Sequence, residues 1–392
     1  MKFRNGTGPS GEGENTGRLW GDDVRPIVLV SRSLEIGGAE RQLAMMAERW
    51  TQLGEPVVVL TLYDGGPLRD AVVQSGVRVL SIGKSGRWDV VRFLWRTRGA
   101  LRALNPRVVY SFLVVPNLVV LLLRSAIPGA RVVLGLRAST VGGIAGDWVS
   151  TLTFRLVALL ANGADAFIAN SEAAARFHIA AGYAAAKMSV IPNGIDAERF
   201  VPDLQGRGRL RKELGLSMQA PVIGMVARLD PLKDHETFLR ACALIGRTLP
   251  DACFIVVGGG DENIRARGEA LTHRLGIGKR VFWLGARADM SAVYSTLDVH
   301  VSTSRSEGFP NVVGEAMSCG VPCVVTPAGD SVAIVDGTGA VVPFGDAGAV
   351  AAACVDLVRS KQTFPDQQSR RRIIAEYGLE RVVGRTTEVL NG

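Results

Sequence analysis

Short runs of apolar residues recur along the chain and alternate with polar loops and longer amphipathic stretches. The first run, residues 26–31, is apolar almost throughout, as in a strand of a parallel sheet that helices cover on both faces. A stretch to about Leu53 follows it, with apolar residues on one helical face. This alternation predicts a doubly wound sheet. Further strands of the series are predicted at residues 57–60, 77–82, 108–112, 131–136, 165–169 and 190–196.

A second series of the same kind begins after a charged, glycine-dotted segment, residues 197–218, and the interdomain linker is placed at its start. The pattern predicts an α/β chain of two Rossmann-like domains, residues 25–197 and 198–375, facing each other across a cleft. Ligands of such folds bind at the carboxyl ends of the strands. Residues 1–24 have no apolar core, and we expect them to be a disordered tail. The strands of the second series are predicted at residues 222–227, 254–257, 281–284, 299–302, 322–325 and 340–342.

One loop of the second series carries two carboxylates around a predicted helix start. Glu307 and Gly308 precede Pro310, which suits a helix start, and Glu315 lies about one turn inside the helix. Free N–H groups at a helix start, behind a glycine, attract phosphate oxygens, and carboxylates accept hydrogen bonds from hydroxyls. The loop therefore suits a nucleotide that carries a sugar. An ordinary strand-to-helix turn with two surface glutamates explains the local pattern equally well.

Two cations lie in another loop at the same predicted sheet edge. Arg228 ends the strand at 222–227, and Lys233 comes just before a helix that Asp234 would cap. A guanidinium and an ammonium in one loop can hold a diphosphate and neutralise it as it leaves. Surface cations without a ligand are the alternative. The glycine loop at residues 257–261 adds a third site of close approach at this edge, or a flexible turn.

Composition narrows the classes of partner. The formal net charge is +8, which favours anionic substrates or an acidic membrane surface. Aromatic residues make up 6% and no motif that binds nucleic acid occurs, so we expect no nucleic-acid partner. The five cysteines are irregularly spaced, which indicates core residues in a reducing, cytoplasmic compartment. The longest apolar run, residues 112–123, is too short to cross a bilayer, so we expect a soluble or peripheral protein.

Read in order, several motifs resemble those of the retaining GT-B-fold glycosyltransferases of family 4 (glycosyl transferases group 1), of the bacterial polysaccharide and lipopolysaccharide type. Each motif is weak alone, but the ordered set spans residues 27–345. The motifs are Gly37-Gly38-Ala39-Glu40-Arg41, Asn170-Ser171, residues 191–196, Arg228 with Lys233, residues 257–260, Leu284-Gly285, and the Glu-seven-Glu motif from Glu307 to Glu315.

The resemblance implies transfer of a sugar from a nucleotide-diphosphate donor to a glycan or lipid-linked acceptor in cell-surface polysaccharide synthesis. The anomeric configuration would be retained, with no metal or other cofactor, and a terminal helix at residues 376–392 would cross back to the first domain. The implied roles are Arg228 and Lys233 on the diphosphate, Glu307 with the backbone of Gly308 and Phe309 on the donor sugar, Asn311 and Val312 beside the donor, Glu315 on the ribose, and Gly37 and Gly38 approaching the phosphates from the other domain.

The sequence departs from the resemblance at one position. Many members of the family carry a histidine after the fifth strand of the first domain, where this chain has Arg137. An arginine cannot act as a base near neutral pH, so Arg137 is expected to bind an acceptor phosphate, to stabilise developing charge or to form a salt bridge.

Two other functions and one membrane surface stay open. A sugar-nucleotide epimerase or phosphorylase would use a similar fold, and so would a non-catalytic protein that binds nucleotide sugars. We also expect peripheral contact with an anionic membrane. It would involve basic residues of two segments, Arg370, Arg371 and Arg372 with Arg92, Arg96 and Arg98.

Overall fold

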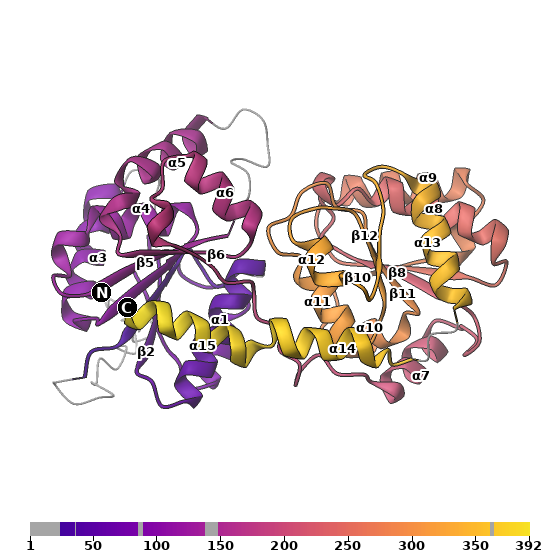
Figure 1. The fold of residues 1–392 in the computed structure, drawn as a ribbon, viewed down its shortest axis with the longest axis horizontal. Coiled ribbons are helices and arrows are strands. Elements are labelled where there is room, and N and C mark those ends of the chain that lie inside the picture. Colours follow the sequence, from indigo (N-terminus) through magenta and orange to yellow (C-terminus); the bar gives the residue numbers. More distant parts are fainter. Residues whose placement is uncertain (1–23, 36, 85–88, 138–147, 361–363) are drawn as a thin grey trace, which may run out of the picture.

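The computed structural model describes residues 24–35, 37–84, 89–137, 148–360 and 364–392. The predicted tail at residues 1–24 lies outside this range except for its last residue. Figure 1 shows two α/β domains side by side, with a terminal helix that returns to the first domain. The predicted fold class, α/β with two Rossmann-like domains, is confirmed.

The N-terminal domain is built on a seven-stranded parallel sheet in the order β3-β2-β1-β4-β5-β6-β7. Its central strands are buried along their whole length, because their apolar side chains face helices on both sides. The strands are β1 (Ile27–Ser31), β2 (Val57–Thr61), β3 (Arg78–Ser81), β4 (Val108–Phe112), β5 (Arg131–Leu136), β6 (Ala166–Ala169) and β7 (Met188–Val190).

Two helical layers cover this sheet. One layer packs through residues such as Phe93, Leu101 and Val157, and the other through residues such as Met46 and Trp50. The first layer consists of α3 (Val90–Leu104), α4 (Val114–Leu122), α5 (Trp148–Leu160) and α6 (Glu172–Ala180), and the second of α1 (Gly38–Gln52), α2 (Arg69–Gln74) and α15 (Leu379–Asn391). In Figure 1, α4 and α5 accordingly lie above the sheet, and α1 and α15 lie below it.

The C-terminal domain has a six-stranded parallel sheet in the order β10-β9-β8-β11-β12-β13, again between two layers. Its strands are β8 (Val222–Val226), β9 (Cys253–Val257), β10 (Val281–Gly285), β11 (Val299–Ser302), β12 (Cys323–Val325) and β13 (Ala340–Val341). One layer contains α8 (His235–Thr248), α9 (Glu262–Arg274) and α13 (Ala347–Arg359), and the other contains α7 (Leu204–Glu213), α10 (Met290–Thr296), α11 (Asn311–Ser318) and α12 (Ser331–Val335).

The chain returns to the N-terminal domain through α14 (Gln367–Arg372), a π-helical turn at Ile373–Tyr377 and α15. Two backbone hydrogen bonds join this crossover to the first crossing: Ile195 N–H donates to Tyr377 O at 2.8 Å, and Leu379 N–H donates to Ile195 O at 3.0 Å. The two crossings therefore run side by side between the domains.

Two segments differ from the sequence prediction. The strand with a turn expected at residues 190–196 begins earlier, at Met188, and ends at Val190, so that most of the predicted segment is loop. The charged segment after it contains helix α7, which Asp203 caps by accepting from Gly206 N–H at 2.7 Å. Arg211 of this helix is fully buried and forms an ion pair with Asp298 at 2.9 Å. Some charged side chains of this segment are therefore buried in ion pairs, which the pattern of charges along the sequence could not show.

None of the helices in the described part of the chain is both long and apolar enough to span a bilayer.

Candidate active site

Loops at the carboxyl ends of both sheets meet between the domains. A Cβ added to Gly308 would lie 3.2 Å from the side chain of Asn170 and 3.4 Å from the backbone oxygen of Arg137, both in the other domain. Similarly, a Cβ on Gly38 would lie 3.3 Å from the Asn311 amide. The structure thus brings the Gly37-Gly38 loop and the Arg137 loop to the Glu307–Glu315 segment. A larger residue at either position would therefore require the facing Asn170 or Asn311 side chain to shift.

Lys233 and Glu307 form an ion pair with 2.5 Å between Nζ and Oε1. Lys233 ends a short 3-10 turn, Pro231–Lys233, whereas Glu307 lies between β11 and α11. Thr303 ties the two loops together: its hydroxyl donates to the backbone oxygen of Lys233 at 3.0 Å. The ammonium and the carboxylate are only 20% and 13% exposed, so both charges are held in place before any ligand binds.

Arg228 follows β8 and is 67% exposed, paired with Asp230 at 2.8 Å. Its loop rests on the glycine loop at residues 258–260. A Cβ on Gly258, which has φ +140°, would lie 1.9 Å from the backbone oxygen of Ala227. These glycines therefore allow close packing of two backbone segments beneath Arg228. This is the loop that the sequence predicts as either a third site of close approach or a flexible turn.

Glu315 is 3% exposed, and both of its carboxylate oxygens have partners. Oε2 accepts from the Tyr294 hydroxyl at 2.6 Å, and Oε1 pairs with the guanidinium of Arg41 on α1 of the other domain. Burial, reinforced by the charge of Glu315, raises the pKa of Tyr294 well above its usual value. A ribose hydroxyl would therefore share this carboxylate with Arg41 or displace it. Arg41 belongs to the Gly37–Arg41 motif, but no role was predicted for it, because nothing near it in the sequence connects it with Glu315.

Arg137 directly follows β5, and its partners among the described residues are neutral groups. Its guanidinium donates to the Tyr110 hydroxyl at 2.8 Å and to Asn193 Oδ1 at 2.7 Å, and it lies 4.6 Å from the centre of the Phe112 ring. Asn193 in turn donates to Asn311 Oδ1 at 2.8 Å, so the network crosses the domain interface. Among the described residues Arg137 forms no ion pair, and the salt bridge considered from sequence is not what is found.

The remaining predicted donor residues differ in what they expose. Phe309 is 6% exposed, and its ring packs 5.6 Å from that of Tyr377, so a ligand would meet its backbone. Val312 is partly exposed on the first turn of α11.

Asp330 is a further residue at this site that sequence reasoning missed. Its backbone N–H donates to Gly308 O at 3.1 Å, and its carboxylate accepts from the backbone N–H of Glu172 at the start of α6. Burial, followed by the negative charge of Glu172, raises the pKa of Asp330 to about 6. No sequence motif pairs these positions, which belong to different domains.

Three histidines are buried and uncharged near neutral pH. Burial lowers the pKa of His178, that of His235 to about 4 and that of His300 to about 3. No cluster of three or more histidine, cysteine, aspartate or glutamate side chains arranged to hold a metal occurs within the described ranges.

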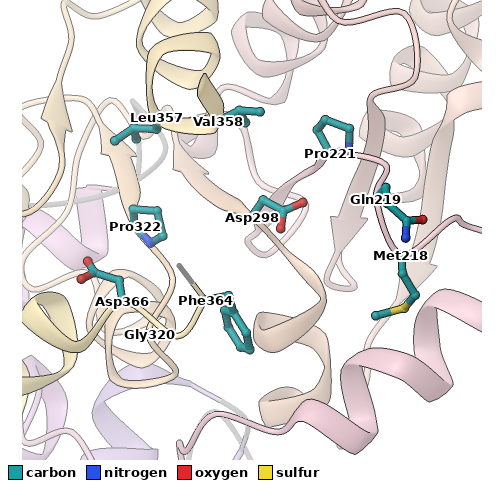
Figure 2. A pocket seen from close by; sticks show the side chains of 10 residues that line it. All are labelled: Met218, Gln219, Pro221, Asp298, Gly320, Pro322, Leu357, Val358, Phe364 and Asp366. Carbon is teal, nitrogen blue, oxygen red and sulfur yellow. The ribbon is translucent and has the colours of Figure 1, made fainter. Parts of the chain in front are cut away.

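A cavity of about 180 Å³ lies at the other end of the C-terminal sheet (Figure 2). Pro221, Asp298 and Pro322, which line it, directly precede β8, β11 and β12. Asp298 there accepts from Arg207 at 2.8 Å and from Arg211 at 2.9 Å. The cavity is therefore remote from the Lys233–Glu307 pair.

The fold, with loops of the two sheets facing each other, is that of two-domain glycosyltransferases. The family model of Glycosyltransferase Family 4 matches residues 36–199, and that of Glycosyl transferases group 1 matches residues 220–360. The two matched ranges together cover most of the chain, and the protein belongs to this glycosyltransferase family.

Relatives of known function match part of the chain. The UDP-Gal:alpha-D-GlcNAc-diphosphoundecaprenol alpha-1,3-galactosyltransferase of Escherichia coli is 37% identical over 142 residues, 36% of each chain. A D-inositol 3-phosphate glycosyltransferase of Mycobacterium sp. (strain KMS) is 36% identical over 193 residues, 47% of this chain and 43% of that one. The match thus spans less than half of these relatives. Anabaena HepE in complex with UDP-glucose has the same fold, with a TM-score of 0.82 at 23% identity, over 93% of this chain and 99% of that one.

Proposed function

We propose that this protein transfers a sugar, with retention of configuration and without a metal ion, from a nucleotide-diphosphate donor to a hydroxyl of a glycan or lipid-linked acceptor. The observation that carries the proposal is the Lys233–Glu307 ion pair, which places a cation for phosphate beside a carboxylate for sugar hydroxyls in the interdomain site. The similar HepE binds UDP-glucose, and the E. coli relative uses UDP-Gal with a lipid diphosphate acceptor, which supports this donor and acceptor chemistry.

In the proposed donor complex, Arg228 and Lys233 bind the diphosphate and the backbone of Gly308 and Phe309 meets the sugar. Lys233 carries three N–H donors, so it can bond a phosphate oxygen while it stays paired with Glu307. Glu307 accepts from sugar hydroxyls through its remaining lone pairs. Gly37 and Gly38 approach the phosphates from the other domain, and Glu315 meets the ribose.

The reaction breaks the bond between the anomeric carbon and the phosphate oxygen, and the electron pair leaves with the nucleotide diphosphate. Positive charge from Arg228 and Lys233 stabilises the developing phosphate charge in place of a metal cation. The acceptor hydroxyl attacks from the same face, and its proton passes to the departing phosphate oxygen. We propose this front-face route because, among the described residues of the site, we find no obvious nucleophile that would form a covalent intermediate, and the carboxylate of Glu307 is paired with Lys233.

We further propose that Arg137 binds a phosphate of the acceptor, because its charge has no carboxylate partner among the described residues. An acceptor that carries a lipid diphosphate fits this chemistry. The protein would then act in cell-surface polysaccharide synthesis, in the cytoplasm and peripherally at the membrane.

The test is a transfer assay with purified protein, preceded by thermal-shift screening of UDP-, GDP- and ADP-sugars. A true donor stabilises the fold by mass action. Lys233→Ala and Glu307→Gln should each lower turnover by at least about 100-fold, as loss of charge stabilisation in a transition state does. Lys279→Ala and Glu269→Gln, at exposed positions of the same domain, are the matched controls.

The proposal fails if both site variants keep wild-type turnover. Donor stabilisation without any transfer to lipid-linked or glycan acceptors would favour a non-catalytic nucleotide-sugar-binding protein. Conversion of the donor sugar into its epimer without an acceptor would favour the epimerase.

A further inference from the structure

Helix α5 is apolar on both of its sides. Phe154 and Val157 face the sheet and are 9% and 1% exposed. On the opposite side, four leucines are spaced so that they form one stripe, and they stay exposed against the described residues. These are Leu152 (49%), Leu156 (41%), Leu159 (79%) and Leu160 (37%). A water-facing stripe without polar residues marks a surface that binds a partner.

Two other helices of the same layer, α4 beside α5 and α3 farther along the sheet, continue this surface. Helix α4 contains no charged residue, and its Val115 and Leu122 are 43% and 52% exposed. On α3, Val91 and Trp95 are 83% and 73% exposed. Because α3, α4 and α5 all pack against the same side of the sheet, their outer sides form one face of the N-terminal domain (Figure 1). We call it the α3–α5 face.

The charges on these three helices have a single sign. Helices α3, α4 and α5 contain no aspartate, glutamate or lysine, but five exposed arginines, which are Arg92, Arg96, Arg98, Arg102 and Arg155. The helices on the other side of the sheet are balanced, since α1 and α15 each carry two glutamates and two arginines. The basic surplus of the domain is thus biased towards the side with the exposed leucines and Trp95.

Two of the three other arginines predicted at a membrane surface are used differently. Arg370 donates to the backbone oxygens of Phe200 and Ala197, both at 3.0 Å, and Arg372 donates to Ile334 O at 2.9 Å. They bind α14 to the C-terminal domain. The helix that follows them, α15, lies on the opposite side of the N-terminal sheet from α3. The two groups therefore do not form one surface.

We propose that the α3–α5 face docks on the surface of an anionic lipid bilayer. Trp95 and the leucines of α5 would enter the headgroup region, and the arginines would bind lipid phosphates. Val91, Trp95, Arg98 and Arg102 lie on one line of α3, so one side of this helix offers two apolar residues followed by two basic ones. A second copy of this chain is a poor partner, because two faces with arginines and no carboxylates repel each other.

This inference deepens the proposed function by naming the surface through which the protein reaches a lipid-linked acceptor, and it rests on that function only for this purpose. Helix α5 is the next α-helix after β5 in the chain, and Arg137 directly follows that strand. A face docked through α5 would therefore belong to the same strand–helix unit as the proposed acceptor-phosphate residue.

The test is co-sedimentation of the full chain with phosphatidylcholine vesicles, with and without phosphatidylglycerol, at physiological salt. We expect binding to the anionic vesicles only. The charge variant R98Q/R102Q should lower the partition coefficient about thirtyfold, since each basic side chain near an anionic surface contributes about 1 kcal/mol. The apolar variant W95S/L159S should lower it at least about tenfold, because it removes two large side chains from the interface.

The matched control is R371Q/R381Q, which makes the same change in net charge at exposed positions of α14 and α15. Its binding should equal that of the wild type. Equal losses in R98Q/R102Q and R371Q/R381Q would mean adsorption by net charge alone and would overturn the proposal. So would absence of binding to anionic vesicles, or a dimer that W95S/L159S dissociates without any vesicle binding.

Thermal stabilisation by the nucleotide sugar, measured on the same variants, separates the two proposals. We expect it to be unchanged in both docking variants, because these residues lie outside the donor site. Vesicle binding without donor stabilisation in the wild type would count against the proposed function and leave the docking surface standing.

Discussion

Arg41 provides a direct test of how the two domains are held together. Its guanidinium pairs with Glu315 across the domain interface, and the side chains are 30% and 4% exposed. Arg41→Met would keep the approximate length of the side chain but remove its charge. Of the two partners that the Glu315 carboxylate has now, only the Tyr294 hydroxyl would remain. Breaking a fully buried pair costs about 3–5 kcal/mol. Since Arg41 is partly exposed and water can enter the vacated position, we expect a loss of about 2–3 kcal/mol in the free energy of unfolding.

The same helix supplies the matched control. Arg49 pairs with Glu380, and its side chain is also 30% exposed, but its partner is 65% exposed. Exposed ion pairs contribute about 0–1 kcal/mol, so Arg49→Met should lower the free energy of unfolding by less than about 1 kcal/mol. The two variants remove the same group from the same helix. The difference between them therefore measures the burial of the partner.

Urea denaturation of the wild type, Arg41→Met, Glu315→Gln and the double variant gives the coupling between the two side chains. We expect a coupling free energy of about 1–2 kcal/mol, since residues in one buried network are not additive. Additivity within about 0.5 kcal/mol would refute the reasoning. So would an Arg41→Met loss no larger than that of Arg49→Met.

Two further predictions concern the N-terminal side of the site and the pH dependence of domain contact. Arg137→Gln should lower kcat/KM for the acceptor about 10- to 100-fold, because a charge-assisted bond to phosphate is lost. The dissociation constant of the donor should stay the same. A matching loss in donor affinity would contradict the acceptor role. Burial raises the pKa of Asp330 to about 6, so the folded state holds the carboxyl proton more tightly than the unfolded chain does. The contribution of this proton to the free energy of unfolding is therefore present at low pH and is lost as the pH rises from about 4 to 6. Asp330→Asn should therefore raise the melting temperature relative to the wild type at pH 7 but not at pH 4, and an equal change at both pH values would refute the assignment.

The sequence by itself determined most of the strands, several helix starts and the loops that share one sheet edge. The buried strands are continuous apolar runs, and a run of that kind is a local signal. The caps predicted at Ser171 and Asp234 are confirmed: Ser171 Oγ accepts from Ala174 N–H at 3.0 Å, and Asp234 caps α8. Arg228, Lys233 and the Glu307 loop follow strands of one sheet, so their shared edge follows from topology.

Only the tertiary structure decided which groups pair across the domain interface. Arg41 and Glu315 are 274 positions apart, and Asn193 and Asn311 are 118 apart. Neither pair follows from periodicity, because the partners belong to separate domains whose relative position depends on packing of the whole chain. Tertiary structure also divided the basic residues. It turned Arg211 and Arg370 inward to backbone oxygens and left those of α3 on the surface. Composition supplies the sum of these charges, and only the fold decides which side of the molecule carries them.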